Sequence, residues 1–263
     1  MKLAARVAGI GLIGPGLASW EAARAALAGR APYARSPAAI PAPEALPATE
    51  RRRAGKSVKL ALATGLAAAK AAGRDPSTLA AVFASSSGDG ENCHAICEVL
   101  ASDDRQISPT RFHNSVHNAP AGYWSIATGA TASADCIAAF DASFGAGLLE
   151  ALARLADDPA LPVVLVAYDA PYPEPLHAAR PVPEPFAVAM VLEAEQGGAG
   201  PIVRAGITRD APQTMANAEL ERVRREIPAA RALPLLELLA RGEPGHAALD
   251  YLDRLALRVE VAP

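Results

Sequence analysis

The run from Val163 to Ala167 constrains the fold more than any other part of the sequence. It reads Val-Val-Leu-Val-Ala, with no polar residue among the five. A continuous apolar run of this kind is typical of a strand that is buried on both faces. Such a strand lies inside a sheet that helices cover on both sides. We therefore expect a strand over 161–168, within a layered α/β fold.

Predicted strands and helices alternate along the chain, which indicates the α/β class, with a mixed and mainly buried sheet flanked by helices. Two proline-rich segments, 31–47 and 171–185, are expected to be extended loops because proline removes backbone donors and opposes helix. Strands are expected over 6–13, 79–85, 134–140, 161–168, 186–193, 202–207 and 255–261, and helices over 19–28, 57–72, 92–100, 122–127, 143–155 and 216–241, the last broken at Pro228.

Composition excludes several classes of function. The chain has 263 residues, of which 51% are hydrophobic and 20% charged, so a sizeable core is expected. A net charge of -3 and an aromatic content of 5% argue against nucleic-acid binding and against binding to a membrane surface. The apolar run over 7–17 is too short to span a bilayer. We expect a cytoplasmic protein without a nucleic-acid or membrane partner.

A GxGxxG pattern over 9–14 raises the possibility of a dinucleotide site. That site needs a helix to open within the glycine motif, and an acidic residue about 20 positions later. Here the run continues with β-like residues, and the expected helix begins only near Ser19. The region where the acidic partner would fall is the proline-rich loop. We therefore expect the glycines to be structural, and no cofactor.

The segment 139–150 predicts a sharp turn that leads into an apolar helix, with Asp141 in the turn. Aspartate is a favourable N-cap, and its charge is stabilising at a helix N-terminus, so capping is one role for Asp141. The same place would also suit a nucleophile, for which Asp141 and Ser143 are the candidates. A nucleophile needs a base within hydrogen-bonding reach, and the sequence shows none nearby.

The polar segment 113–122 holds two histidines, His113 and His117, four residues apart. This spacing allows metal ligation from one helix face, but the segment contains loop-forming residues and offers no third ligand, so no metal is expected. We expect the histidines to hold the loop by hydrogen bonds. Cys93 and Cys97 are expected to be buried on a helix. The chain has three cysteines, an odd number that does not indicate a disulfide framework.

Three segments together resemble the β-ketoacyl synthases. The first is a glycine-marked strand and the helix after it, the second is the polar loop before the turn, and the third is the turn itself. The resemblance is stronger to the short ketosynthase-like chain-length factors of aryl polyene pathways, whose runs HNSVHNxxAGYW and YDASFxAGLLEAL are nearly matched here. The segments are 6–16 with 20–22 and 27–30, then 113–122, and then 139–150.

The resemblance implies a thiolase-like half-fold: a single ketosynthase-like N-terminal domain over 1–263, with a short C-terminal helix–strand extension. It places Asp141 where the family carries its nucleophilic cysteine, so no catalytic residue is expected. Polyketide chain-length factors more often carry glutamine there, and aspartate departs from that pattern. Two histidines of the family's second half have no counterpart in the chain, where His246 lies in a turn-like context.

By resemblance, the chain pairs with a full-length ketosynthase as a heterodimer and serves chain elongation on an acyl carrier protein. A half-fold is expected to expose a large sheet and helix face that the partner covers. Phe112, Tyr123, Trp124 and Phe144 are the candidates for shaping an acyl tunnel. The full set of tunnel and interface candidates is Phe112, His113, Asn114, His117, Asn118, Tyr123, Trp124, Asp141, Ser143 and Phe144.

Two alternatives stay open. The chain could be a standalone acyltransferase or thioesterase that uses Asp141 or Ser143. The basic run 51–53 could be a docking patch for an acidic carrier protein rather than a solvated helix start.

Overall fold

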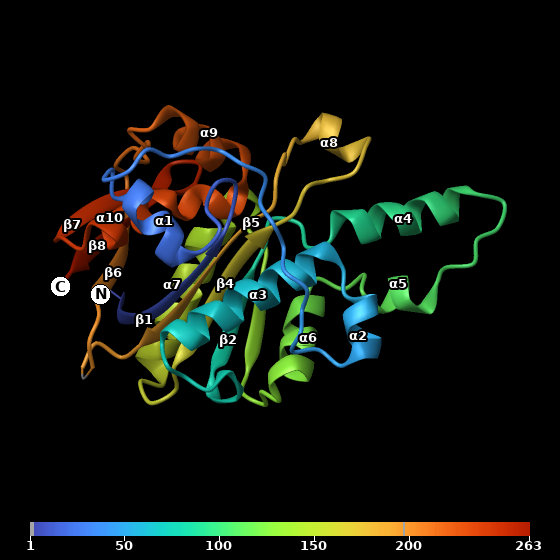
Figure 1. Cartoon of the computed structure of the whole chain (residues 1–263), viewed down its shortest axis with the longest axis horizontal. Coiled ribbons are helices and arrows are strands. Elements are labelled where there is room, and N and C mark those ends of the chain that lie inside the picture. Colours follow the sequence, from blue (N-terminus) through green and yellow to red (C-terminus); the bar gives the residue numbers. More distant parts are fainter. Residues whose placement is uncertain (1–2, 197) are drawn as a thin grey trace.

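A single mixed sheet of eight strands forms the centre of the fold in the computed structural model, which describes residues 3–196 and 198–263 (Figure 1). The strand order is β3-β2-β4-β5-β1-β6-β8-β7. β2 runs parallel to β3 and β4, and every other neighbouring pair is antiparallel. The predicted α/β class is confirmed. The strands are β1 (Leu3–Ile13), β2 (Ala80–Ala84), β3 (Ala134–Ile137), β4 (Val163–Asp169), β5 (Phe186–Glu193), β6 (Ile202–Thr208), β7 (Gly245–Leu252) and β8 (Leu255–Ala262).

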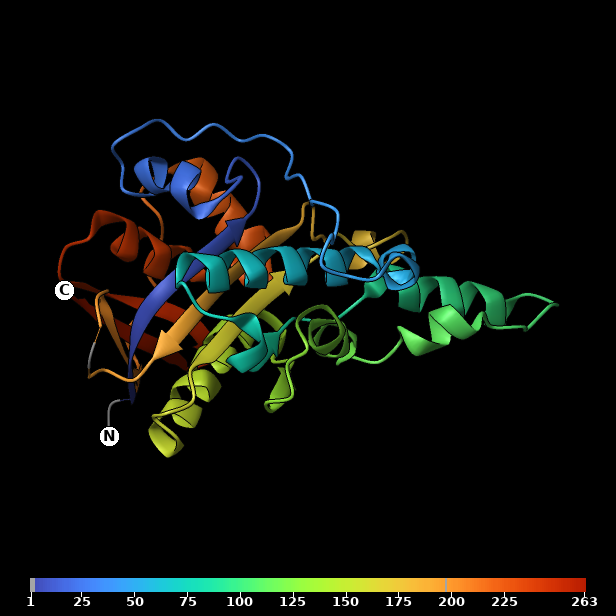
Figure 2. The same cartoon turned by 60° about the horizontal axis from the view of Figure 1, so that its bottom comes forward.

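Helices cover both faces of this sheet, as Figure 2 shows from a second direction. α3 and α6 pack on one face, while α7, η3 and α10 pack on the other. The helices are α1 (Trp20–Leu27), α2 (Ala48–Arg53), α3 (Lys56–Ala71), α4 (Gly90–Ala101), α5 (Pro109–His113), α6 (Ala119–Thr128), α7 (Ser143–Asp157), α8 (Leu176–Ala179), α9 (Ala218–Glu226) and α10 (Leu233–Arg241), with 3-10 turns η1 (Pro76–Thr78), η2 (Phe140–Ala142) and η3 (Pro228–Ala232).

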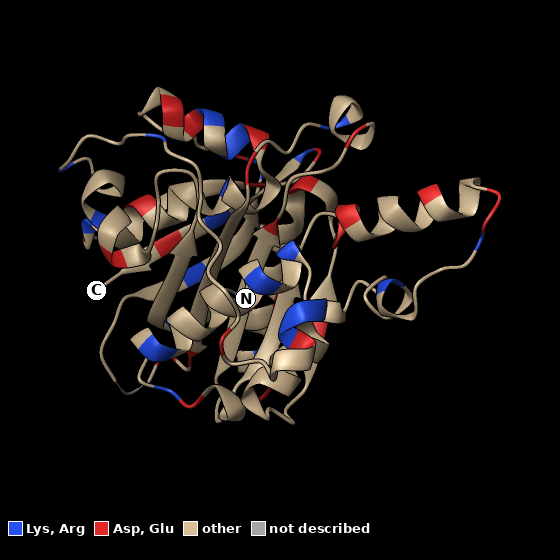
Figure 3. Cartoon of the chain, turned by 45° about the vertical axis from the view of Figure 1, so that its right-hand side comes forward, with Lys and Arg blue, Asp and Glu red and all other residues tan. Residues whose placement is uncertain are grey.

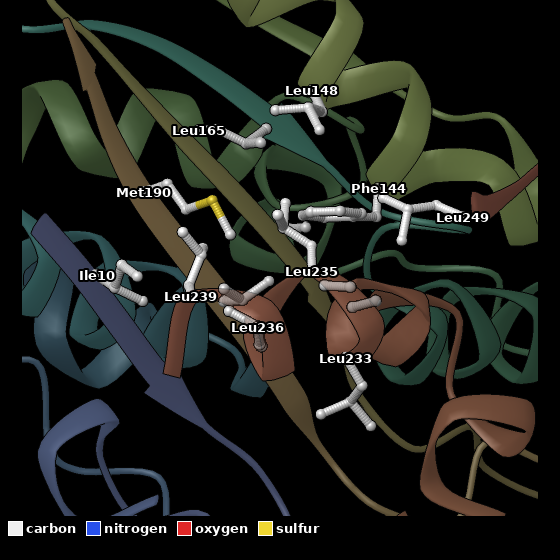
Figure 4. Close-up of a cluster of buried hydrophobic side chains, with 14 of the residues drawn as sticks. Ile10, Phe144, Leu148, Leu165, Met190, Leu233, Leu235, Leu236, Leu239 and Leu249 are labelled. Carbon is white, nitrogen blue, oxygen red and sulfur yellow. The ribbon is translucent and has the colours of Figure 1, made fainter. Parts of the chain in front are cut away.

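The strand predicted from the apolar run is β4, and all seven of its residues are buried. Its side chains alternate between two hydrophobic clusters, one on each face of the sheet. Leu165 lies in the cluster under α7, where Figure 4 shows it near Leu148 and Met190, above the leucines of α10. Val166 lies in the cluster under α3 and α6. Because both faces are covered, no polar residue is needed along the strand until Asp169 at its end.

The C-terminal region differs from its prediction in one element. The break at Pro228 is confirmed, since η3 separates α9 from α10. The strand β7 was not predicted, and His246 lies on it, paired with Glu260 of β8, rather than in a turn. The segment Gly-His-Ala-Ala that opens β7 has little β propensity and follows Pro244, so the sequence favours a turn there. β7 forms because β8 offers it a neighbouring strand.

This C-terminal region also corrects the expected exposure of a large sheet and helix face. α7, η3 and α10 bury the second face of the sheet with this chain's own side chains, and α1 packs against α10 (Figure 4). All nine residues of α10 except Arg241 are buried. The half-fold therefore completes its own core, and the apolar surface that stays exposed lies elsewhere.

Glycines of β1 allow α3 to pack directly on the sheet. A Cβ atom built on Gly11 would lie 2.1 Å from the backbone oxygen of Thr64, and one on Gly9 would lie 2.4 Å from the backbone nitrogen of Ala72. Real Cβ atoms do not approach backbone atoms so closely. The glycine pattern over 9–14 thus serves helix–sheet packing, which supports its structural interpretation.

Replacing Gly11 with alanine is expected to lower the free energy of unfolding by about 2 kcal/mol, because the new methyl group must push α3 away from β1. Gly206 of β6 gives a matched control, since a Cβ atom there meets nothing within 4 Å. Urea unfolding of both variants measures the difference, and Gly206→Ala should change stability by about 0.5 kcal/mol or less. Equal losses in the two variants would contradict this packing account.

An arm formed by α4, α5 and the loop between them projects from the body of the fold (Figures 1 and 2). Asn92 is the one buried residue of α4, and α5 has none. Cys93 and Cys97 lie on α4 as predicted, but both are exposed rather than buried, because no part of the described chain packs over the arm. α4 carries two glutamates and α5 one arginine (Figure 3).

Within the described residues, none of the helices combines the length and the hydropathy that crossing a bilayer requires.

Candidate functional site at the elbow between β3 and α7

The predicted sharp turn is present between β3 and α7. β3 ends at Ile137, η2 follows after two residues, and α7 begins at Ser143. Phe140 has a φ angle of 53°, and it is the one non-glycine residue with a positive φ in the part of the chain that the structure describes. A strained turn between a strand and a helix is typical of a nucleophile elbow, but the left-handed residue here is Phe140 and not its neighbour Asp141.

Asp141 does not cap α7. The N-cap position belongs to Ala142, which makes no side-chain hydrogen bond to the helix. The carboxylate of Asp141 turns instead towards two arginines: Oδ1 accepts a hydrogen bond of 2.6 Å from Arg180, and Oδ2 lies 3.5 Å from the guanidinium of Arg231. The predicted capping role is therefore wrong, because two cations that are distant in sequence, Arg180 after α8 and Arg231 in η3, attract the carboxylate more strongly than the helix end does.

The ion pairs continue beyond Asp141 into the C-terminal region. Arg231 donates to Asp250 of β7 at 2.7 Å, and Asp250 also pairs with Arg224. Arg224 is buried and pairs in turn with Glu221 on α9 at 2.7 Å. Charges of alternating sign thus connect the elbow to α9 and β7, beside a cleft of about 410 Å³ that Asp141, Arg231 and Asp250 help to line.

Ser143 is held by the backbone of the elbow. Its hydroxyl donates to the carbonyl oxygen of Phe140 at 2.7 Å and accepts from the amide of Ala139 at 3.0 Å. The side chain is buried. Among residues 3–196 and 198–263, no histidine hydrogen-bonds to Ser143 or Asp141, so neither has the base that a nucleophile needs.

Cys136 is the cysteine that lies nearest to the elbow in sequence. It sits on β3, and burial raises the pKa of its thiol to about 11. A thiol with such a pKa stays protonated at neutral pH and is a poor nucleophile. The elbow therefore contains a carboxylate, a structural hydroxyl and an inert thiol.

A buried carboxylate that was not predicted from the sequence connects β4 by hydrogen bonds to the end of β2 and to η3. Asp169, at the end of β4, accepts hydrogen bonds from the amide of Ser86 at 2.9 Å, the hydroxyl of Ser86 at 2.7 Å and the amide of Ala229 at 2.8 Å. Burial raises its pKa to about 6. The sequence signal was a charged residue directly after a buried strand, together with the serines 85–87 that follow β2.

An asparagine, and not the two histidines, makes the hydrogen bonds that hold the polar segment 113–122 in place. Asn114 donates to the carbonyl oxygen of Arg53 at 2.9 Å and accepts from the hydroxyl of Tyr123 at 3.1 Å. His113 is exposed and stacks edge-on against Tyr123, while the buried Nε2 of His117 has no hydrogen-bond partner in the described chain. Asn118 precedes α6 without a side-chain cap. No group of three metal-ligating side chains occurs among the described residues.

The four aromatic tunnel candidates lie in different places. Tyr123 and Trp124 belong to α6 and are buried against one face of the sheet. Phe144 belongs to α7 and is buried against the other face (Figure 4). Phe112 lies on the arm with 68% of its surface exposed. The structure does not bring these four together, and of them Phe112 alone has surface available to a ligand or partner.

The basic run 51–53 forms the last turn of α2 rather than a helix start. Arg51 and Arg53 pair with Glu44 and Glu50. A groove of about 630 Å³ lies beside this turn, at the start of α3. Its cationic lining residues are Arg52, Arg53, Lys56, Lys59 and Arg111.

Comparison with known proteins relates this fold to the ketosynthases. The profile of the β-ketoacyl synthase N-terminal domain matches residues 20–245, which is most of the chain. The chain belongs to the β-ketoacyl synthase N-terminal domain family. No curated protein sequence matches it.

Solved structures support the same fold. A chain of the ketosynthase (ApeO) in complex with its chain length factor (ApeC) from Xenorhabdus doucetiae is 26% identical, with a TM-score of 0.74 and coverage of 98% of this chain and 99% of that one. The ishigamide ketosynthase/chain length factor gives 13% identity, a TM-score of 0.71 and coverage of 98% and 99%. A ketosynthase from module 6 of the bacillaene synthase of Bacillus subtilis is 14% identical, with a TM-score of 0.60. The match covers 85% of this chain but 45% of that one.

Proposed function

We propose that this chain is a non-catalytic, chain-length-factor-like subunit that pairs with an active β-ketoacyl synthase. The pair would extend polyene or fatty-acid-type chains, of the aryl polyene kind, on an acyl carrier protein. The elbow carries this proposal. It holds Asp141 at the position that resemblance assigns to cysteine, and two arginines form ion pairs with that carboxylate. A carboxylate cannot carry an acyl chain as a thioester, so the thiol must come from another subunit.

The free edge of the sheet supports a partner subunit. β3 pairs with β2 on one side, and its other side has no strand in the described chain. An unpaired edge is a template for a second chain. Two exposed large apolar side chains belong to neighbouring elements: Ile126 is on α6, which contacts β3, and Phe140 lies three residues after the end of β3. Phe112 of α5 and Val116, which follows α5, are further exposed large apolar side chains.

The relatives support a ketosynthase as that partner. The chain covers nearly the whole of its match in the ApeO–ApeC complex but less than half of the bacillaene ketosynthase. The full-length ketosynthase would thus supply the cysteine and both histidines of the pair. The cationic groove beside α2 suits an acidic carrier protein, because opposite charges steer and orient such encounters.

The alternative of a standalone acyltransferase or thioesterase is less well supported. Its two candidate nucleophiles, Asp141 and Ser143, are both engaged in structural contacts. We therefore expect the isolated chain to show no turnover of acyl thioesters. Turnover that disappears in a Ser143→Ala variant would favour the enzyme instead.

Co-purification tests the pairing. The tagged chain is to be co-expressed with each full-length ketosynthase of its source genome, and the captured material weighed by native mass spectrometry. The proposal predicts a complex of one copy of each chain with one of these ketosynthases. A well-folded monomer or a self-dimer that captures none of them would contradict it.

A further inference from the structure

Phe140 combines two features that do not stabilise the isolated chain. Its backbone is left-handed, with φ at 53°, a conformation that costs a side chain with a Cβ atom about 1 kcal/mol or more. The residue is 62% exposed to solvent, so little apolar surface is buried in return. Strained non-glycine residues that persist in a fold concentrate at functional sites.

The exposed ring is nevertheless held in place. The guanidinium carbon of Arg180 lies 3.5 Å from the ring centroid, which is a close cation–π contact. The same guanidinium donates to Asp141 at 2.6 Å. Arg180 is therefore fixed by the carboxylate next to Phe140, and it fixes the ring in turn. Asp141 also offsets the charge of Arg180, which lowers the cost of removing this group from water.

The position of Phe140 fits the centre of an interface. Phe140 lies three residues after the end of β3, the strand at the free edge of the sheet, and Ile126 is exposed on α6, which contacts β3. Energetically dominant interface residues are aromatic residues and arginines that a partner desolvates completely. A ring that is already ordered before binding loses little conformational freedom when the partner closes over it.

We propose that Phe140 is the anchor residue with which this chain binds its ketosynthase partner, and that Arg180 and Asp141 are positioning residues for it. The inference rests on the proposed function and adds to it the residue that holds the pair together. The ketosynthase is the occupant we propose because it shares this fold and can place a matching strand edge against β3. A second copy of this chain would be a competing occupant.

The test measures binding of the purified ketosynthase to variants of the full chain. Phe140→Ala should raise Kd at least thirtyfold, as truncation of a dominant interface aromatic does. Phe140→Tyr should stay close to wild type, because the ring is kept. Ile207→Ala is a matched control: Ile207 is exposed on β6, which β1, β5, β4 and β2 separate from β3 in the sheet, so its Kd should not change.

Two further variants separate anchoring from simple folding effects. Phe140→Gly removes both ring and strain, so it should melt at or above the wild-type temperature while binding at least thirtyfold more weakly. Arg180→Ala should weaken binding about fivefold, and Arg180→Lys should restore most of it, because a cation over the ring is kept.

The outcomes separate the two proposals. If wild type binds no ketosynthase, or only itself, the proposed function fails. If wild type binds and Phe140→Ala binds equally well, the pairing stands and the anchor role is overturned.

Discussion

Replacing Asp169 with alanine is expected to lower the free energy of unfolding by about 3–5 kcal/mol. The side chain is fully buried, and it is the acceptor for the amides of Ser86 and Ala229. Each buried amide left without an acceptor costs about 1–3 kcal/mol, and the seryl hydroxyls lose their partner as well. Urea unfolding followed by circular dichroism measures this loss.

Two controls make the Asp169 result specific. Asp169→Asn keeps the shape, but its amide group can present only one oxygen to donors that arrive at both carboxylate oxygens, so a loss of about 2 kcal/mol is expected. Asp253→Ala, on the exposed turn between β7 and β8, should change stability by about 0.5 kcal/mol or less. If Asp169→Ala unfolds no more easily than Asp253→Ala, the carboxylate does not join β2, β4 and η3 as the hydrogen bonds indicate.

Replacing Asp141 with cysteine is expected to create a reactive thiol but not a condensing enzyme. Arg180 and Arg231 would then face a thiol, and nearby cations favour the thiolate. At neutral pH we expect the introduced thiol to react with iodoacetamide about tenfold faster than the exposed thiols of Cys93 and Cys97. Mass spectrometry of peptides after timed alkylation gives the three rates in one sample.

The double variant Asp141→Cys with Arg180→Ala is the control, because it should lose most of that enhancement. Neither variant should form a condensation product from acyl and malonyl thioesters in isolation, since no histidine lies within hydrogen-bonding reach of the elbow in the described chain. An introduced thiol that reacts more slowly than Cys93 would show that the two arginines do not act on this position.

The sequence predicted those parts of the structure that depend on local patterns. Continuous apolar residues indicated β4, and the segment 139–150 indicated the sharp turn and the apolar helix α7. Proline indicated the loop over 31–47, whereas the loop predicted over 171–185 contains the short helix α8. β7 was missed because its residues have weak β propensity, and its stability comes from pairing with β8.

The site was less predictable for a related reason. Arg180 and Arg231 reach Asp141 from positions 39 and 90 residues away along the chain, and no spacing rule connects such positions. A local rule therefore assigned Asp141 a capping role that tertiary contacts override. Phe140 was overlooked because a left-handed φ is expected of glycine, asparagine or aspartate, and nothing in the sequence distinguishes an exposed phenylalanine from a buried one.

The location of the acyl group tests the central claim most directly. The purified complex of this chain with its ketosynthase is to be incubated with octanoyl-coenzyme A, and the mass of each intact subunit measured. We predict an octanoyl adduct on the ketosynthase and none on this chain. An adduct on this chain, above all when it is incubated alone, would contradict the claim that its elbow contributes structure and binding but no acyl-carrying nucleophile.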